Sequence, residues 1–129
     1  MRTLTDHKVN GLNEALVVTV LDDPGDGGAN HQYRIDLTAA PGGDSRLSGR
    51  TSQWLIDFQK GPIQEAGLNG LSNEALLAVV IDRLRGFQSG EFACRENALA
   101  LTKLEESLMW LQKRTRDRIG RGVEGTNQI

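Results

Sequence analysis

Two arginines near the end of the chain, Arg114 and Arg118, are the residues best suited to ligand chemistry. They lie four positions apart, so on a helix they project from the same side. A pair of guanidinium groups can clamp phosphate oxygens, and the plane of one group can stack on a purine base. The alternative interpretation is a solvated basic end, which favours a helix C-terminus.

A second candidate pair, Phe87 and Asn97, flanks the turn before the last predicted helix. An aromatic face beside an amide suits a nucleobase, although a phenylalanine at this spacing also fits a core position. On a helix, Asn97 and Arg114 are about 25 Å apart at roughly 1.5 Å per residue. One small ligand therefore reaches both only if a second chain supplies one of them. An antiparallel homodimer does this and creates two equal pockets.

A leucine seam positions these residues on the last predicted helix. Its spacing by four and three keeps one side of the helix against a partner surface. The seam has polar ends, which are either solvated helix ends or ligand-binding groups on a helical platform. Three apolar residues off the seam, Leu99, Met109 and Trp110, are candidates to cover a dimer interface. The seam comprises Asn97, Leu101, Leu104, Leu108, Leu111, Thr115 and Arg118.

The second half of the chain predicts two helices joined by a short loop, an antiparallel hairpin. Ser72 is a plausible N-cap for the first helix, and Glu74 favours the dipole of its first turn. Gly86 and Gly90 bracket the end of that helix. Apolar residues at helical spacing in it are Leu77, Val80, Ile81, Leu84 and Phe87. The second helix runs from about Glu96 to Ile119, without a convincing N-cap, and is stopped by Gly120 and Gly122.

The first half of the chain predicts strands. Residues 16–21 are a β-branched run, and residues 33–38 and 54–59 alternate apolar with polar side chains. The turn-rich segment 22–30 links the first two strands as a long hairpin loop, and residues 39–53 form a second flexible connection. The predicted class is α+β: an N-terminal antiparallel sheet (residues 1–62) followed by a homo-oligomerising, ligand-binding helical hairpin (residues 63–129). Together they would form one compact domain.

The composition of the chain limits which classes of partner and site are expected. The chain has 129 residues and a net charge of −2, so a polyanion partner such as long nucleic acid is not expected. A local basic tip at residues 113–121 suits a small anion better. The single Cys94 fits a reducing cytosol and, with only two histidines, makes a zinc site improbable. No signal peptide, membrane span, cofactor motif or catalytic signature stands out, and a structural thiol is the default for Cys94.

The segment from Gly61 to Thr126, about half of the chain, resembles the phage family of Thoeris anti-defence proteins, which has shorter relatives that counter CBASS immunity. The resemblance is carried by the blocks GFQSG, LMWLQKRT and RGVEGT in this order. The N-terminal half is similar to the longer, Thoeris-type members only in being a small β region.

This resemblance implies a non-catalytic, hexameric sponge acting in the cytoplasm of the infected bacterial host. Its ligands would be cyclic ADP-ribose isomers and CBASS cyclic dinucleotides or trinucleotides. The family's ligand-contacting phenylalanine, asparagine and two helix arginines fall on Phe87, Asn97, Arg114 and Arg118. The turn that includes Val123, Glu124, Gly125 and Thr126 would close the same pocket through backbone and hydroxyl groups.

Two other functions remain open on the sequence. A hydrolase of the same messenger would need Glu124 or Asp117 as general base, and neither has a partner that the sequence identifies. A structural phage oligomer would leave the arginines as solvated helix ends.

Overall fold

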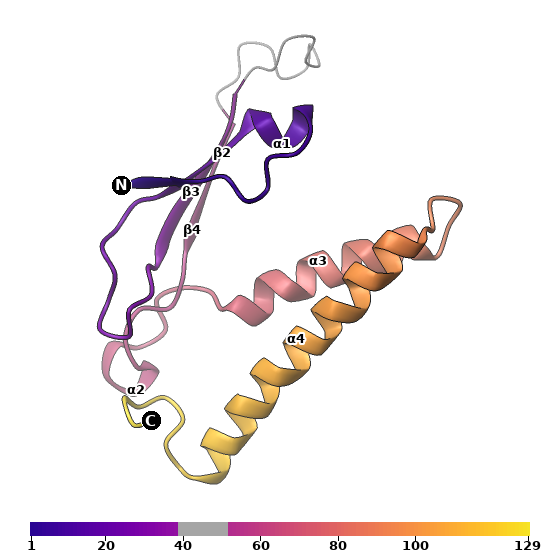
Figure 1. Cartoon of the computed structure of the whole chain (residues 1–129). Helices are drawn as coiled ribbons and strands as arrows, with labels where there is room; N and C mark the ends of the chain where they lie inside the picture. The colour runs from indigo at the N-terminus through magenta and orange to yellow at the C-terminus, as the bar shows by residue number, and fades with distance from the viewer. Residues whose placement is uncertain (39–51) are drawn as a thin grey trace. The chain divides into compact units, whose positions relative to one another are not determined.

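The computed structural model describes residues 1–38 and 52–129 and contains two compact units, residues 1–60 and 61–129. The first unit is an antiparallel sheet and the second contains a helical hairpin (Figure 1). The predicted α+β class, with a small antiparallel sheet followed by a C-terminal helical hairpin, is therefore confirmed. None of the helices among the described residues is both long enough and apolar enough to cross a membrane.

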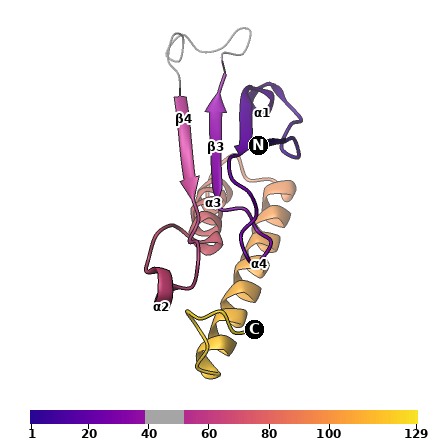
Figure 2. The same ribbon diagram turned by 90° about the vertical axis from the view of Figure 1, so that its left-hand side faces the viewer.

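The sheet has four strands in the order β1-β2-β3-β4, and every neighbouring pair is antiparallel. Figure 2 shows β3 and β4 running in opposite directions. Two elements of this unit were not predicted, strand β1 and helix α1 (Gly11–Ala15), because three to five residues are too few to establish a period. The strands are β1 (Arg2–Leu4), β2 (Leu16–Val20), β3 (Gln32–Leu37) and β4 (Ser52–Asp57).

The register gathers apolar side chains on one face of the sheet. Val18 lies opposite Ile35, and Ile35 lies opposite Trp54. Since side chains alternate between faces, the other face is mostly polar, with Val17 and Leu55 as exceptions, and it carries the Arg34–Asp36 ion pair at 2.8 Å. Among the described residues only three apolar residues are buried, Ala15, Val20 and Ile81. Much apolar surface of this chain therefore remains open to solvent.

The predicted hairpin loop at residues 22–30 is confirmed, since it joins the paired strands β2 and β3. The Asp22 carboxylate accepts hydrogen bonds from the backbone N–H groups of His31 and Gln32. Burial raises the pKa of the Asp22 carboxyl, but these bonds outweigh it, so the pKa lies below its ordinary value. The second predicted connection, residues 39–53, lies mostly outside the described residues. Its last two residues, Ser52 and Gln53, belong to β4.

The second unit contains α2 (Ile63–Ala66), which was not predicted, α3 (Asn73–Gln88) and α4 (Arg95–Gly120). The Ser72 cap is confirmed, because its hydroxyl accepts from the Ala75 N–H at 3.1 Å. The expectation that α4 lacks an N-cap was wrong. The Cys94 sulfur accepts a hydrogen bond from the Asn97 N–H at 3.4 Å and so caps the helix. Because sulfur is a weak hydrogen-bond acceptor, the sequence did not indicate this cap.

The leucine seam is confirmed as the protected side of α4, because its seven positions are all buried or half-buried. On α3 the protected side is narrower than predicted. Ile81 is buried and Leu77 and Leu84 are half-buried, whereas Val80 and Phe87 are 45% and 38% exposed. Val80 and Phe87 therefore lie on the flank of α3 rather than in its packed side.

Candidate functional site

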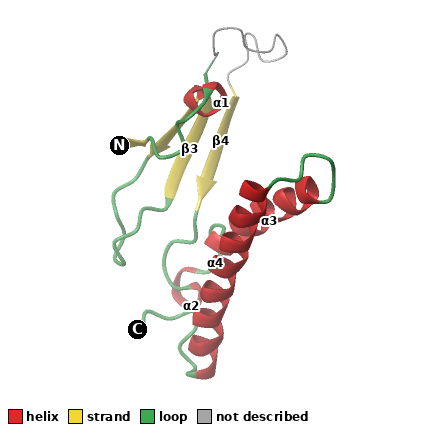
Figure 3. Ribbon diagram, turned by 45° about the vertical axis from the view of Figure 1, so that its right-hand side comes forward, coloured by secondary structure: helices red, strands yellow, loops and turns green. Residues whose placement is uncertain are grey.

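The C-terminal end of α4 and the segment that follows it enclose an open basic groove of about 580 Å³. After α4 the chain turns back beside the helix end (Figure 3). The groove thus forms within a single unit of the chain, from one helix and its own continuation. The residues that line it are Trp110, Lys113, Arg114, Asp117, Arg118, Arg121, Thr126, Asn127, Gln128 and Ile129.

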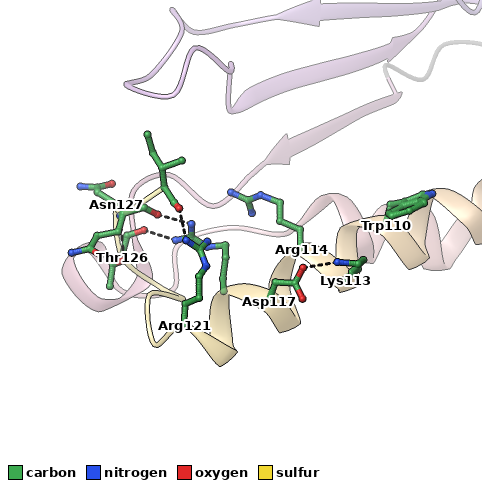
Figure 4. A pocket seen from close by; sticks show the side chains of 10 residues that line it. Trp110, Lys113, Arg114, Asp117, Arg121, Thr126 and Asn127 are labelled. Atoms are coloured by element: carbon green, nitrogen blue, oxygen red, sulfur yellow. Dashed lines mark hydrogen bonds and ion pairs between the residues drawn. The ribbon is translucent and has the colours of Figure 1, made fainter.

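Cations outnumber acids among the residues that line this basic groove. The ammonium of Lys113 pairs with Asp117 at 2.7 Å, and Arg121 donates to the Ile129 carbonyl at 2.9 Å. Arg114 makes no hydrogen bond or ion pair with any described residue, and Figure 4 shows its side chain extended without a bond. Arg114 is therefore the cation most available to an anionic ligand.

Arg118 has a different role from Arg114 although both come from the same helix face. Only 7% of Arg118 is exposed. Its Nε donates to a Glu124 carboxylate oxygen at 3.1 Å, and its Nη2 donates to the carbonyls of Val123 and Thr126 at 3.0 Å. Its Nη1 donates to the Gln128 carbonyl. Because four of its five donors are engaged, Arg118 holds the turn in place, and the ligand contact predicted for it stays a prediction.

The turn at residues 122–126 also accepts hydrogen bonds from α2. The backbone N–H of Gln64 donates to the Gly125 carbonyl at 3.1 Å, and its side-chain amide donates to the Glu124 carbonyl at 3.1 Å. Gly125 adopts a φ of +80°, a conformation that suits glycine. The predicted turn residues therefore form one ordered structure, and the sequence carried no signal for the contribution of Gln64.

We expect Gly125→Ala to destabilise the chain by about 1–3 kcal/mol, the cost of holding a side chain in a rare backbone region. An added Cβ would lie 2.9 Å from the Ile63 Cγ1 atom, so steric conflict adds to this strain. The matched control is Gly120→Ala, where no atom lies within 4 Å and the φ is not positive. In a helix this substitution is expected to stabilise by about 0.5–1 kcal/mol. Urea unfolding that gave both variants the same sign would contradict the strain at Gly125.

The other predicted pair, Phe87 and Asn97, lies at the loop end of the hairpin. Phe87 is partly exposed, and the Arg83 guanidinium lies 5.1 Å from its ring centroid, a cation–π contact that the sequence did not predict. Asn97 is half-buried in the first turn of α4. The structure thus brings Arg114, Arg118 and Thr126 into one groove, and it leaves Phe87 and Asn97 at the opposite end of α4.

Trp110, Lys113 and Arg121 line the basic groove but were not among the predicted site residues. Trp110 was predicted to cover an interface, and the described residues leave it 56% exposed. The signal for its place in the groove was its spacing of four from Arg114, which puts both on one helix side. An indole wall next to a free guanidinium offers both stacking and charge to a planar anion.

The acids near the groove are already engaged. Asp117 is paired with Lys113, and Glu124 with Arg118. Within residues 1–38 and 52–129, no three or more potential metal ligands gather. The arrangement is best suited to binding a small anion that also has an aromatic ring.

These observations define a class: a small α+β protein with a basic, aromatic-edged groove on a helical hairpin. Residues 53–116 match the family model described as Acb2/Tad1, hairpin domain. That segment is similar to the hairpin domain of this family, and the predicted resemblance is confirmed. The match includes Arg114 and ends before Arg118 and the turn.

The chain is also 62% identical over 73 residues to a protein named Thoeris anti-defense 1 from Bacillus phage SBSphiJ7. The aligned region covers 57% of this chain and 51% of that relative, so the chain spans about half the length of the curated relative that it matches.

Proposed function

We propose that this chain is a phage anti-defence protein that binds and sequesters cyclic nucleotide immune signals without cleaving them. Cyclic ADP-ribose isomers of Thoeris are its first class of ligand, and CBASS cyclic dinucleotides and trinucleotides are the second. The proposal draws support from the family of the hairpin and from the name of the phage relative. The protein acts in the cytoplasm of the infected host, where these signals are made.

The observation that carries the proposal is the unpaired Arg114 guanidinium beside Trp110 in the basic groove. Phosphate oxygens of the ligand bind Arg114 through charge-assisted hydrogen bonds, which are stronger than neutral ones. Trp110 stacks on a base, an interaction worth roughly 1–3 kcal/mol. The backbone of residues 123–126, held by Arg118, closes the pocket, and Thr126 lines the groove.

The assembly that completes this pocket is an antiparallel homodimer, which associates further to a hexamer. About 25 Å of helix separates the Phe87 and Asn97 end from Arg114 at roughly 1.5 Å per residue. A second copy therefore supplies Phe87 and Asn97 to each groove. The exposure of Leu99 and Met109, 51% and 50%, leaves apolar surface on α4 for this contact. Such a preformed site keeps the entropic cost of binding low.

We expect cyclic ADP-ribose recovered from the complex by heating to be chemically intact. Asp117 and Glu124, the two residues considered as general base, are both ion-paired, which disfavours their activating a water molecule. Mass spectrometry of the released ligand after prolonged incubation measures this. A linear product would contradict sequestration and favour the hydrolase.

A thermal-shift control separates the sponge from a purely structural oligomer. A tight ligand at 100 times its dissociation constant stabilises the folded state by about 2.7 kcal/mol and raises the melting temperature. A panel of cyclic ADP-ribose isomers, cyclic dinucleotides and cyclic trinucleotides that left the melting temperature unchanged would contradict binding of any kind.

A further inference from the structure

We propose that Arg121 is a second ligand-binding residue of the basic groove, where it binds one phosphate group while Arg114 binds another. This role of Arg121 rests on the proposed function, because it neutralises the second charge of the same ligands. Cyclic ADP-ribose isomers and cyclic dinucleotides each carry two phosphate groups, joined as a pyrophosphate in the first and separate in the second. Arg114 supplies one positive charge, so the second phosphate needs another cation.

Two of the four cations that line the groove within the described residues are committed to protein groups. The ammonium of Lys113 lies 2.7 Å from the Asp117 carboxylate, so moving it to a ligand would leave that carboxylate facing a phosphate. Arg118 is 7% exposed, and its guanidinium donates to the carbonyls of Val123 and Thr126. Turning Arg118 towards a ligand would leave these part-buried acceptors without their donor, which costs free energy. The two cations that remain are Arg114 and Arg121.

The side chain of Arg121 makes a hydrogen bond that a ligand can replace. Its Nη1 donates to the Ile129 carbonyl at 2.9 Å, the one hydrogen bond of this side chain with a described residue. Ile129 is fully exposed, so water can replace Arg121 on that carbonyl, and no buried acceptor loses its partner. A hydrogen bond from a guanidinium to a phosphate joins two charged groups and is stronger than one to a neutral carbonyl. A ligand phosphate therefore displaces the Ile129 carbonyl from Arg121.

Arg121 also lies on the same side of the helix as Arg114. The two residues are two helical turns apart, which returns the side chain to nearly the same direction and separates the Cα atoms by about 10 Å at roughly 1.5 Å per residue. Arg121 is the C-cap of α4 and keeps helical backbone angles, φ −88° and ψ −3°, so this spacing applies to it. Figure 4 shows both side chains extending from the helix towards the same side. The two guanidinium groups can therefore approach one ligand from two positions along the groove.

The charges of the groove complement a ligand with two phosphate groups. The Lys113–Asp117 pair carries no net charge, and Arg118 is neutralised by Glu124 at 3.1 Å. These ion pairs cancel two of the positive charges of the groove and leave those of Arg114 and Arg121. Two separate positive charges on one helix side therefore face the two negative phosphates.

The test is isothermal titration calorimetry of Arg121→Ala with a cyclic ADP-ribose isomer and with cyclic di-adenosine monophosphate, which share the adenine base. We expect the affinity for each probe that the wild-type chain binds to fall by about three- to tenfold. This loss is smaller than the one expected for Arg114→Ala, because Arg121 exchanges an existing bond. The matched control is Arg116→Ala, which removes the same charge outside the groove. Arg121→Lys keeps a cation that binds phosphate as a point charge, so it should recover part of the loss.

A second readout reports on the Arg121 guanidinium in the unaltered chain. In a proton–nitrogen NMR spectrum, the Nε–H resonance of Arg121 should shift on saturation with a bound probe, whereas that of Arg116 should not. Equal affinities of Arg121→Ala and Arg116→Ala, or an unshifted Arg121 resonance, would overturn the role of Arg121 and leave the proposed function intact. Binding of neither probe by the wild-type chain would contradict the proposed function, and the role of Arg121 with it.

Discussion

Arg114→Ala is expected to lower the affinity for a cyclic ADP-ribose isomer by about 10- to 100-fold. This corresponds to the roughly 1.5–3 kcal/mol that hydrogen bonds to a charged group contribute. Arg114 has no described partner, so its removal leaves no protein group unsatisfied, and the fold should not change. The loss should therefore appear in binding alone. Isothermal titration calorimetry with the cyclic ADP-ribose isomer measures it directly.

The matched control for this prediction is Arg116→Ala. Arg116 lies two residues away on the same helix, is exposed, and does not line the basic groove. Both variants remove one positive charge, so they alter the general field equally and differ only in local contact. Equal losses of affinity would show that overall charge attracts the ligand, and an unchanged affinity for Arg114→Ala would remove Arg114 from the site.

The hairpin was predictable because α4 follows a regular period over many turns. The seam from Asn97 to Arg118 alternates by four and three, and these positions are protected in the structure. Strand β2 was predictable from its β-branched run, and β3 from an alternation of apolar and polar residues that extends over several positions. Periodicity reports which side of an element is protected. It does not report what a polar residue on that side contacts.

The features that the sequence did not reveal depend on single contacts between segments distant in the chain. Gln64 reaches the turn across 60 positions, and no local pattern marks such a pairing. The cap at Cys94 uses a weak sulfur acceptor that propensity rules give little weight. Arg118 and Arg114 project from the same side of α4, yet the guanidinium of Arg118 is buried and that of Arg114 is free. Spacing placed both arginines together, and only tertiary structure separates their roles.

Arg118→Ala is expected to destabilise the folded chain by about 3 kcal/mol, the lower end of the range for removing one partner of a buried ion pair. The lower end applies because Glu124 is 37% exposed and water can partly replace the lost bond. The carbonyls of Val123, Thr126 and Gln128 would also lose their donor. We expect ligand affinity to fall as well, because the turn that closes the groove would lose its order.

Urea unfolding at fixed chain concentration measures the stability, and hydrogen exchange of residues 123–128 reports whether the turn opens. Arg121→Ala is the matched control, since Arg121 is exposed and makes one bond, and its effect should stay within about 0.5 kcal/mol. Arg118→Lys keeps the charge but replaces a planar fork by a single ammonium, so it should recover only a small part of the loss. Full recovery by lysine would show that charge alone matters. Unchanged exchange in Arg118→Ala would show that the turn is ordered without Arg118, which would return its guanidinium to the set of direct ligand contacts.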